Sequence, residues 1–170
     1  MKAYALVLTG LAVGIAAPAA FAQDKSALPA SGSFKLHSGW KGVGDSVQVG
    51  ENHTFGTGNF WGVTFNDAGS GALHLGTVVC PYTLDTIGGA STGQGTCAWS
   101  DADGDKIFTS YSGKGLPSGS FDGVNKITGG TGKFKDIQGQ APFQCQFLND
   151  KGQANCTQQF EYQLTAGAKQ

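Results

Sequence analysis

The stretch Phe143–Thr157, FQCQFLNDKGQANCT, decides the fold. Apolar and polar residues alternate on both sides of Asn149–Gly152, which is the pattern of two antiparallel strands joined by a turn. If Asn149–Gly152 is a four-residue loop, Cys145 lies directly opposite Cys156 on the neighbouring strand. The stretch therefore predicts a β-hairpin with its two cysteines in register.

The two faces of this hairpin, extended to the C-terminal end of the pattern, differ in chemistry. Residues two apart share a face of a strand, so each face can be read from the sequence. Glu161 falls on the polar face, and we interpret it as a solvated acid rather than a catalytic one. With the cysteines, the apolar face carries Phe143, Phe147, Phe160, Tyr162 and Leu164, and the polar face carries Gln144, Gln146, Asn155, Thr157, Gln159, Glu161 and Gln163.

Short alternating runs separated by Gly, Asn and Asp continue through the rest of the chain, and no helical periodicity lasts longer than one turn. The pattern predicts an all-β protein of eight or nine antiparallel strands. Without helices to cover it, such a sheet must close on itself or fold into a sandwich. The runs are Gly32–Trp40, Asp45–Val49, Asn59–Asn66, Gly71–Val79, Thr96–Asp101, Lys106–Ser112, Ser120–Thr128, Ile137–Leu148 and Gln153–Thr165.

A second hairpin is expected around Asp103-Gly104, a dipeptide that favours a type I′ turn. This turn predicts Trp99 opposite Phe108 and Asp101 opposite Lys106. The alternative is a calcium loop of the EF-hand type, which needs Gly at its sixth position and an acid at its twelfth. Here Gly is fourth and the twelfth residue is Ser, so the turn is favoured.

The N-terminal segment Met1–Ala22 has the order of a secretory signal peptide: Lys2, an apolar run, and small residues at positions 20 and 22. The apolar run is shorter than the roughly 20 residues that span a membrane. We therefore expect cleavage after Ala22, a periplasmic or secreted product without a membrane span, and a single domain over residues 23–170.

The composition of the mature chain argues against nucleic acid as a partner. Without Lys2 it has 10 Lys against 12 Asp and Glu, and the chain contains no Arg. Proteins that read nucleic acid use basic stripes and the bidentate guanidinium group of Arg. Neither feature is present in this sequence.

Four cysteines in an exported chain most simply form two disulfides, for which three pairings exist. If the hairpin register joins Cys145 to Cys156, then Cys80 must pair with Cys97. No Cys-x-x-Cys spacing occurs, and no His lies close to any Cys. We expect neither a metal site nor a cofactor, because the three histidines, His37, His53 and His74, also lie far apart.

The stretch Ile127–Gln140 contains Gly129-Gly130-Thr131-Gly132-Lys133-Phe134, with a further Gly five residues after the Phe. It resembles the signature strand and loop of the allene oxide cyclase and dirigent-type barrels, and Cys97–Phe108 resembles exported bacterial members of that group. The resemblance implies a calycin-like, allene oxide cyclase-like fold: a single closed antiparallel β-barrel of about eight strands. It also implies that Phe134 folds inward as a plug, and alternation then points Lys133 outward.

The resemblance supports fold more than activity. Plant cyclases of this group use a buried carboxylate and an ordered water, and no acid of this chain matches that carboxylate by motif. Glu51 is the nearest in type and is the one weak catalytic candidate. Dirigent proteins rely on acids together with an Arg, which this chain lacks. Related plant barrels are dimers or trimers, so a homo-oligomer is possible.

Three functions from different classes follow. The leading hypothesis is a non-catalytic binder of a small apolar molecule, held in the barrel interior; the same rings could instead simply fill the barrel as its core. The second is an isomerase or cyclase, and the third an extracellular interaction or inhibitor module that presents Gly56–Trp61 as an exposed loop. The lining residues would come from Trp40, Phe60, Trp61, Phe65, Trp99, Phe108, Phe143 and Phe160.

Overall fold

The structure is a computed structural model that describes residues 28–165. The predicted signal peptide, residues 1–22, lies outside the described residues. Within residues 28–165, no helix is long and apolar enough to cross a membrane.

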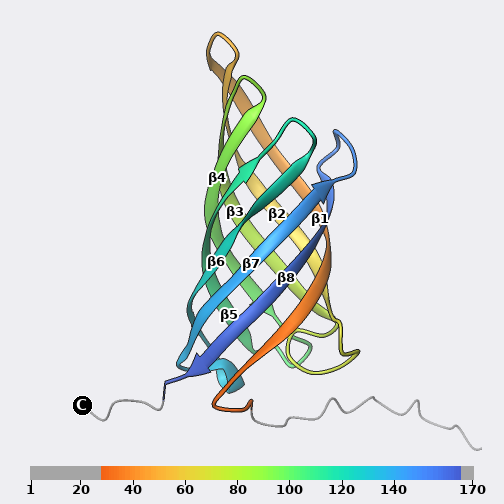
Figure 1. Cartoon of the computed structure of the whole chain (residues 1–170), viewed down its shortest axis with the longest axis vertical. Coiled ribbons are helices and arrows are strands. Elements are labelled where there is room, and N and C mark those ends of the chain that lie inside the picture. The colour runs from red at the N-terminus through yellow and green to blue at the C-terminus, as the bar shows by residue number, and fades with distance from the viewer. Residues whose placement is uncertain (1–27, 166–170) are drawn as a thin grey trace, which may run out of the picture.

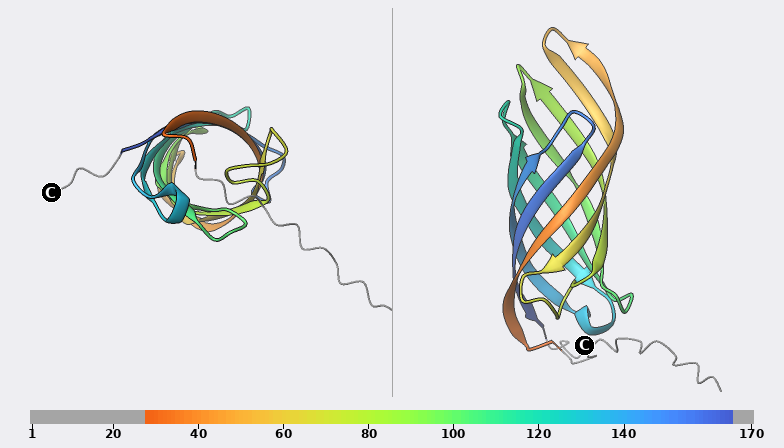
Figure 2. Two further views of the ribbon diagram at one scale, coloured as in Figure 1. Left: turned by 90° about the horizontal axis from the view of Figure 1, so that it is seen from below. Right: turned by 90° about the vertical axis from the view of Figure 1, so that its right-hand side faces the viewer.

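Eight antiparallel strands form one closed barrel, which confirms the predicted fold class (Figure 1). Each strand pairs with the next along the chain, and β8 pairs with β1 to close the ring, as the end-on view in Figure 2 shows. The single helical element of the described chain is a 3-10 turn, η1, at Gly132–Phe134. The strands are β1 (Ser31–Gly50), β2 (His53–Asn66), β3 (Gly76–Ile87), β4 (Ala90–Ser100), β5 (Lys106–Gly115), β6 (Ser120–Gly130), β7 (Ile137–Phe147) and β8 (Gln153–Leu164).

Several strands are longer than the sequence pattern predicted. The runs Gly32–Trp40 and Asp45–Val49 belong to one strand, β1, although Gly42 and Gly44 suggest a break between them. The interior explains these glycines, because a Cβ at Gly42 would clash with the ring of Phe60. Glycine therefore marks a place where an aromatic ring lies on the backbone, and not a turn.

The registers of the two predicted hairpins have different outcomes. Cys145 is paired with Cys156 in the β7–β8 register, and both predicted disulfides, Cys80–Cys97 and Cys145–Cys156, are present. The register around Asp103-Gly104 was wrong by one residue.

In the β4–β5 hairpin, Trp99 pairs with Ile107 rather than with Phe108. The cause is a larger loop than expected: the backbone N–H of Asp101 donates to the carbonyl of Asp105 at 2.9 Å, and that of Gly104 donates to the carbonyl of Asp101 at 3.0 Å. A slip of one residue moves a side chain to the other face of a sheet. Phe108 accordingly points out of the barrel.

Two connecting segments, η1 and the β2–β3 loop, lie together at one end of the barrel (right-hand view of Figure 2). Phe134 of η1 is fully buried, which confirms its predicted role as a plug. Leu73 of the β2–β3 loop is fully buried beside it, in a loop held by Thr64, whose Oγ1 donates to the Leu73 carbonyl at 2.6 Å. The run Gly71–Val79 was therefore misplaced, because its first residues form this loop.

The prediction that Lys133 points outward was wrong. Its Nζ lies 2.5 Å from Asp101 Oδ2 and 3.0 Å from Asp103 Oδ2, and its side chain is only 17% exposed. The 3-10 turn explains the difference, because neighbouring residues of such a turn do not alternate between two faces as they do in a strand. Lys133 thereby connects η1 to the β4–β5 loop.

Candidate functional site: the barrel lumen

A cavity of about 170 Å³ occupies the part of the barrel away from the closed end. It is bounded mostly by aromatic and apolar side chains that point inward from all eight strands, with glycines between them. The residues that line it are Trp40, Phe60, Cys80, Tyr82, Thr83, Leu84, Ser91, Gly93, Cys97, Trp99, Tyr111, Gly115, Leu116, Gly119, Ser120, Phe121, Asn125, Phe143, Cys145, Phe147, Ala154, Cys156 and Gln158.

The aromatic rings form a connected set across the lumen. Trp40 packs edge-on against Trp99, with ring centroids 5.7 Å apart, and against Phe60 at 6.4 Å. Phe60 in turn contacts Tyr82 at 4.6 Å. Edge-to-face contacts hold rings in defined orientations, so these residues make a rigid apolar wall.

The two disulfides are part of the same wall. Cys80–Cys97 joins β3 to β4, and Cys145–Cys156 joins β7 to β8. In a ring of eight strands these two hairpins are four strands apart, on opposite sides of the lumen. Each disulfide fixes the two strands that it joins, so both sides of the cavity are held covalently.

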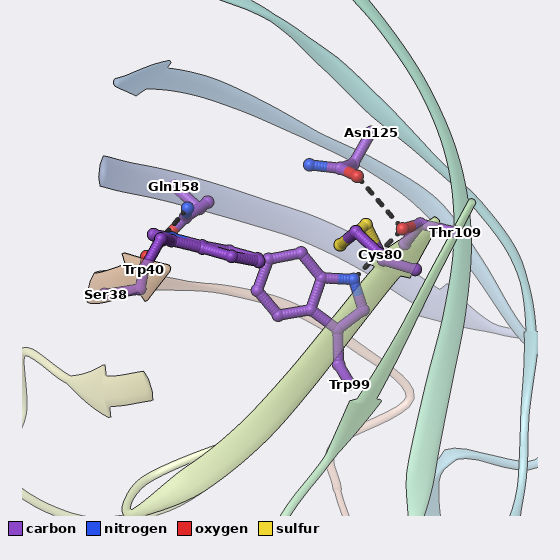
Figure 3. Close-up of a disulfide and its surroundings, with 8 residues drawn as sticks. Ser38, Trp40, Cys80, Trp99, Thr109, Asn125 and Gln158 are labelled. Carbon is purple, nitrogen blue, oxygen red and sulfur yellow. Dashed lines mark hydrogen bonds between the residues drawn. A yellow bond between two sulfur atoms is a disulfide. The ribbon is translucent and has the colours of Figure 1, made fainter. Parts of the chain in front are cut away.

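Polar groups lie at the inner end of the cavity, where they form two short hydrogen-bonded chains (Figure 3). In the first chain, Trp99 Nε1 donates to Thr109 Oγ1 at 3.0 Å, and that hydroxyl donates to Asn125 Oδ1 at 3.0 Å. Because Thr109 occupies Oδ1, the amide NH₂ of Asn125 is the group that this side chain can offer to the lumen.

The second chain runs between β1 and β8. Trp40 Nε1 donates to Ser38 Oγ at 2.7 Å, and Ser38 Oγ lies 3.0–3.1 Å from the amide of Gln158. Gln158 and Ser38 are 4% and 3% exposed, so both are effectively removed from water. A buried amide with spare hydrogen-bonding capacity is the kind of group that fixes the orientation of a bound molecule.

The three tyrosines of the described chain have raised pKa values, each chiefly because burial disfavours the phenolate. The pKa of Tyr111 is raised most, by burial and by the neighbouring Tyr82. That of Tyr82 is raised by burial and by the charge of Asp45, and that of Tyr162 by burial. The phenols of the lumen therefore remain neutral at any physiological pH.

Alkaline titration of the folded, mature protein should show this directly. We expect little tyrosinate absorbance near pH 10, where a free tyrosine is about half ionised, and a cooperative rise at higher pH as the barrel unfolds. Unfolded tyrosines ionise first, so stability should fall as the pH rises above about 10. The measurement is ultraviolet absorbance with circular dichroism beside it; three tyrosines that titrate normally in a fully folded barrel would contradict the prediction.

The eight predicted lining residues divide into three groups. Trp40, Phe60, Trp99 and Phe143 line the cavity. Phe160 is fully buried below it, with its ring 5.4 Å from that of Trp99.

The other three predicted lining residues lie on the outer wall. Trp61 and Phe108 are 50% and 37% exposed, and Phe65 stacks on the exposed His37 with ring centroids 5.3 Å apart. Trp61 and Phe65 share the outward face of β2. The sequence did not show this, because Phe60 and Trp61 are adjacent aromatic residues and either could be the one that faces inward. None of the three can line the lumen.

Glu51 lies in the exposed turn between β1 and β2, at the end opposite the plug. It does not line the cavity, and no Asp, Glu, His or Lys is among the described residues that do. Gly56–Trp61 is part of strand β2 and is not the exposed loop expected for an inhibitor. Among residues 28–165, no group of three or more His, Cys, Asp or Glu is placed to hold a metal ion.

Sequence reasoning missed several lining residues, among them Tyr82, Tyr111, Phe121 and Phe147. Phe147 was placed on the correct face of its hairpin but was not carried into the lining set. Tyr82 lies between the predicted runs Gly71–Val79 and Thr96–Asp101, in residues that were assigned to no strand. Rings such as those of Tyr82 and Phe121 lie over glycines of neighbouring strands, and the pattern of a single strand does not show such a contact.

Comparison with known proteins bears on the fold alone. No family model matches the chain, and no curated protein matches it. Among solved structures, the chain is similar to that of the pterocarpan synthase dirigent protein GePTS1, with a TM-score of 0.50 and 18% sequence identity over 88% of this chain and 100% of that one. At this identity the likeness shows a dirigent-like barrel fold and no more.

Proposed function

We propose that the protein binds one small apolar molecule in the barrel lumen, outside the cytoplasm, and carries out no chemistry on it. The observation that carries this proposal is the cavity itself: it is open at one end, plugged at the other, and lined by rigid aromatic rings. Eight-stranded barrels have an interior just wide enough to be filled by side chains or to hold one small ligand. Here the side chains leave space.

The volume limits the size of the ligand. An engineered cavity of about 150 Å³ lined by apolar side chains binds benzene. A cavity of about 170 Å³ therefore suits a molecule with one aromatic ring or a comparable alicyclic group. A larger ligand would extend through the open end.

The polar groups suggest which end of the ligand enters first. Asn125 and Gln158 lie at the inner end, each 4% exposed, while the rest of the wall is largely apolar. A ring with one hydroxyl or carbonyl group could place that group against the two amides and leave its apolar part among the aromatic rings. Since the amides are neutral, the ligand should be uncharged.

The lining argues against the cyclase alternative. General acid–base catalysis needs a side chain that exchanges a proton near neutral pH within reach of the substrate. The tyrosines of the lumen have raised pKa values, and the described lining has no carboxylate or imidazole. The similar barrel of a protein called a pterocarpan synthase does not change this argument, because at 18% identity the likeness concerns the fold.

A location outside the cytoplasm rests on the N-terminal sequence and on the cysteines. Met1–Ala22 has the pattern of a cleaved signal peptide. All four cysteines form disulfides, and such bonds persist in oxidising compartments. Both observations favour a periplasmic or secreted protein.

The test is calorimetric titration of the mature chain with p-cresol, a single ring with one hydroxyl, and with toluene, which lacks the hydroxyl. We expect both to bind, and p-cresol to bind up to about tenfold more tightly through the amides. Replacing Ala154, a buried lining residue, with Leu fills the lumen and should weaken both affinities at least about tenfold.

The matched control is Asn155→Leu, the neighbouring position of the same strand, which faces outward and is exposed. It should leave p-cresol affinity unchanged, and circular dichroism should show that both variants keep the barrel. The proposal is overturned if neither p-cresol nor toluene binds. It is also overturned if the wild type and the folded Ala154→Leu variant bind the probes equally well.

A further inference from the structure

The side chain of Asn125 carries a buried hydrogen-bond donor that no other described residue uses. Asn125 lies on β6, lines the cavity and is 4% exposed. Its Oδ1 accepts the hydroxyl of Thr109 at 3.0 Å, but among residues 28–165 its Nδ2 makes no hydrogen bond. A buried NH₂ group without a partner is costly to a fold. A molecule in the cavity can supply the acceptor that this group lacks.

The neighbouring side chains fix which way this amide faces. Trp99 Nε1 is only a donor, so Thr109 Oγ1 accepts from it and has one hydrogen left to donate. Asn125 Oδ1 accepts that hydrogen, which turns Nδ2 away from Thr109 (Figure 3). With the amide reversed, the Thr109 hydrogen would lose this acceptor. The indole of Trp99 thus sets the orientation in which Asn125 presents its NH₂ group.

The residues around the Asn125 amide leave its nitrogen accessible. Tyr111, its partner across the β5–β6 register, leans the other way, because its hydroxyl lies over a glycine of β4. On β7, Asn125 faces Ala141, whose side chain is a single methyl group. Gln158, the other amide of the lining, differs, because its Oε1 and Nε2 both lie within 3.1 Å of Ser38 Oγ. Asn125 is therefore the amide with a whole NH₂ group to offer.

An NH₂ group selects a ligand by its acceptor oxygen. A carbonyl oxygen has lone pairs and no hydrogen, so it pairs with Nδ2 and needs nothing more. A hydroxyl also brings a hydrogen, and the two nearest oxygens, Asn125 Oδ1 and Thr109 Oγ1, are already hydrogen-bonded. A carboxylate would be buried without a counter-charge, because the described lining contains no Lys or His. The site therefore fits a neutral carbonyl group best.

We propose that the ligand is an uncharged carbonyl compound of about one ring, and that Asn125 determines this specificity by donating from Nδ2 to the carbonyl oxygen. This inference rests on the proposed binding function and goes further in naming the chemical class of the ligand. The cavity of about 170 Å³ limits the ligand to about one ring. Hydrogen bonds in a chain polarise one another, so donation from Trp99 through Thr109 strengthens the Asn125 donor.

The experiment is calorimetric titration of the mature protein with acetophenone, 1-phenylethanol and toluene. The first two share a carbon skeleton and differ in having C=O or CH–OH, and toluene has no polar group. The wild type should bind acetophenone about tenfold more tightly than 1-phenylethanol. Asn125→Leu keeps a branched side chain of similar length and removes the donor. It should lower acetophenone affinity about tenfold, abolish the preference and still bind toluene.

Infrared absorption gives a second readout that a change in packing alone would not reproduce. A carbonyl that accepts a hydrogen bond absorbs at a lower frequency than one in an apolar environment. The C=O stretch of bound acetophenone should therefore lie lower in the wild type than in Asn125→Leu. The matched control is Asn155→Leu, the same substitution at an exposed position of the outer wall, which should leave the affinities and the stretch unchanged.

Thr109→Val is a second variant, which tests the inference even if Asn125→Leu does not fold. It frees Asn125 Oδ1, so the amide can reverse, and the preference for acetophenone should fall to about twofold or less. The inference is wrong if the wild type binds toluene but does not prefer acetophenone to 1-phenylethanol, or if the preference survives in the folded Asn125→Leu or Thr109→Val variant. Failure of all three probes to bind would contradict the proposed lumen function as well.

Discussion

Phe134→Ala is expected to lower the free energy of unfolding by about 3–5 kcal/mol. The ring is fully buried at the closed end of the barrel, within the same cluster as Ile107, Ile137 and Leu73, which are at most 1% exposed. Its removal leaves a cavity that these neighbours cannot fill, because each is fixed on a strand or in a loop held by hydrogen bonds. A loss of this size is a large part of the stability of an ordinary domain.

The measurement is urea unfolding of the mature protein, followed by circular dichroism. Phe108→Ala is the matched control: it removes the same side chain from the outer wall, where the ring is 37% exposed, and should cost much less. Equal losses in the two variants would show that Phe134 does not act as a plug.

The sequence predicted best where local pattern and long-range pairing agree. In the β7–β8 hairpin the turn residues, the alternation and the two cysteines all require one register, with Cys145 opposite Cys156, and that register is observed. Two constraints likewise act on the glycine-rich stretch before Phe134. The backbone of Gly132 has a positive φ of 54°, which favours glycine, and the Phe134 ring two residues later is fully buried. Several constraints on one segment leave few alternatives.

The polar residues of the lumen were missed because the apolar face was identified by its apolar residues. Alternation places Gln158 on the same face as Cys156 and Phe160, but as a polar residue it was left out of that face. Asn125 is more misleading, because its neighbour Val124 is the apolar residue of the pair. Asn125 is nevertheless 4% exposed and Val124 is 43% exposed, since Thr109 and Trp99 supply a hydrogen-bonded place inside the barrel. Such an inversion depends on strands that are remote in sequence.

The β4–β5 loop shows a third cause of error. Asp103-Gly104 alone favours a two-residue turn. In the structure, Asp101 Oδ1 accepts the backbone N–H of Asp103, and Asp101 Oδ2 faces Lys133 from a different part of the chain. The side chain of Asp101 is 3% exposed and therefore needs these partners. Tertiary pairing of Asp101 thus accompanies the wider loop and the one-residue shift of the hairpin.

Lys133 carries the second large expected effect, because it is the cation that faces the buried carboxylate of Asp101. Burial lowers the pKa of Lys133, but hydrogen bonds and attraction from Asp101 and Asp103 outweigh it and leave the pKa raised. A raised lysine pKa means that folding gains from the charged form. This contribution is complete below the ordinary value of about 10.5 and is lost as the pH rises through the raised pKa.

Lys133→Ala should therefore destabilise the barrel by about 1.5–3 kcal/mol at neutral pH, since it leaves the acceptor oxygen of Asp101 unpaired and largely removed from water. Urea unfolding measures this loss, and Lys135→Ala, an exposed lysine two residues away, should change stability by less than about 0.5 kcal/mol. Asp101→Asn keeps an oxygen to accept the Asp103 N–H and removes the charge, so adding Lys133→Ala to it should cost much less than Lys133→Ala alone. A loss that is the same in both backgrounds would mean that the contact of Lys133 Nζ with the Phe134 ring, 5.6 Å from its centroid, and not pairing with Asp101, accounts for the effect.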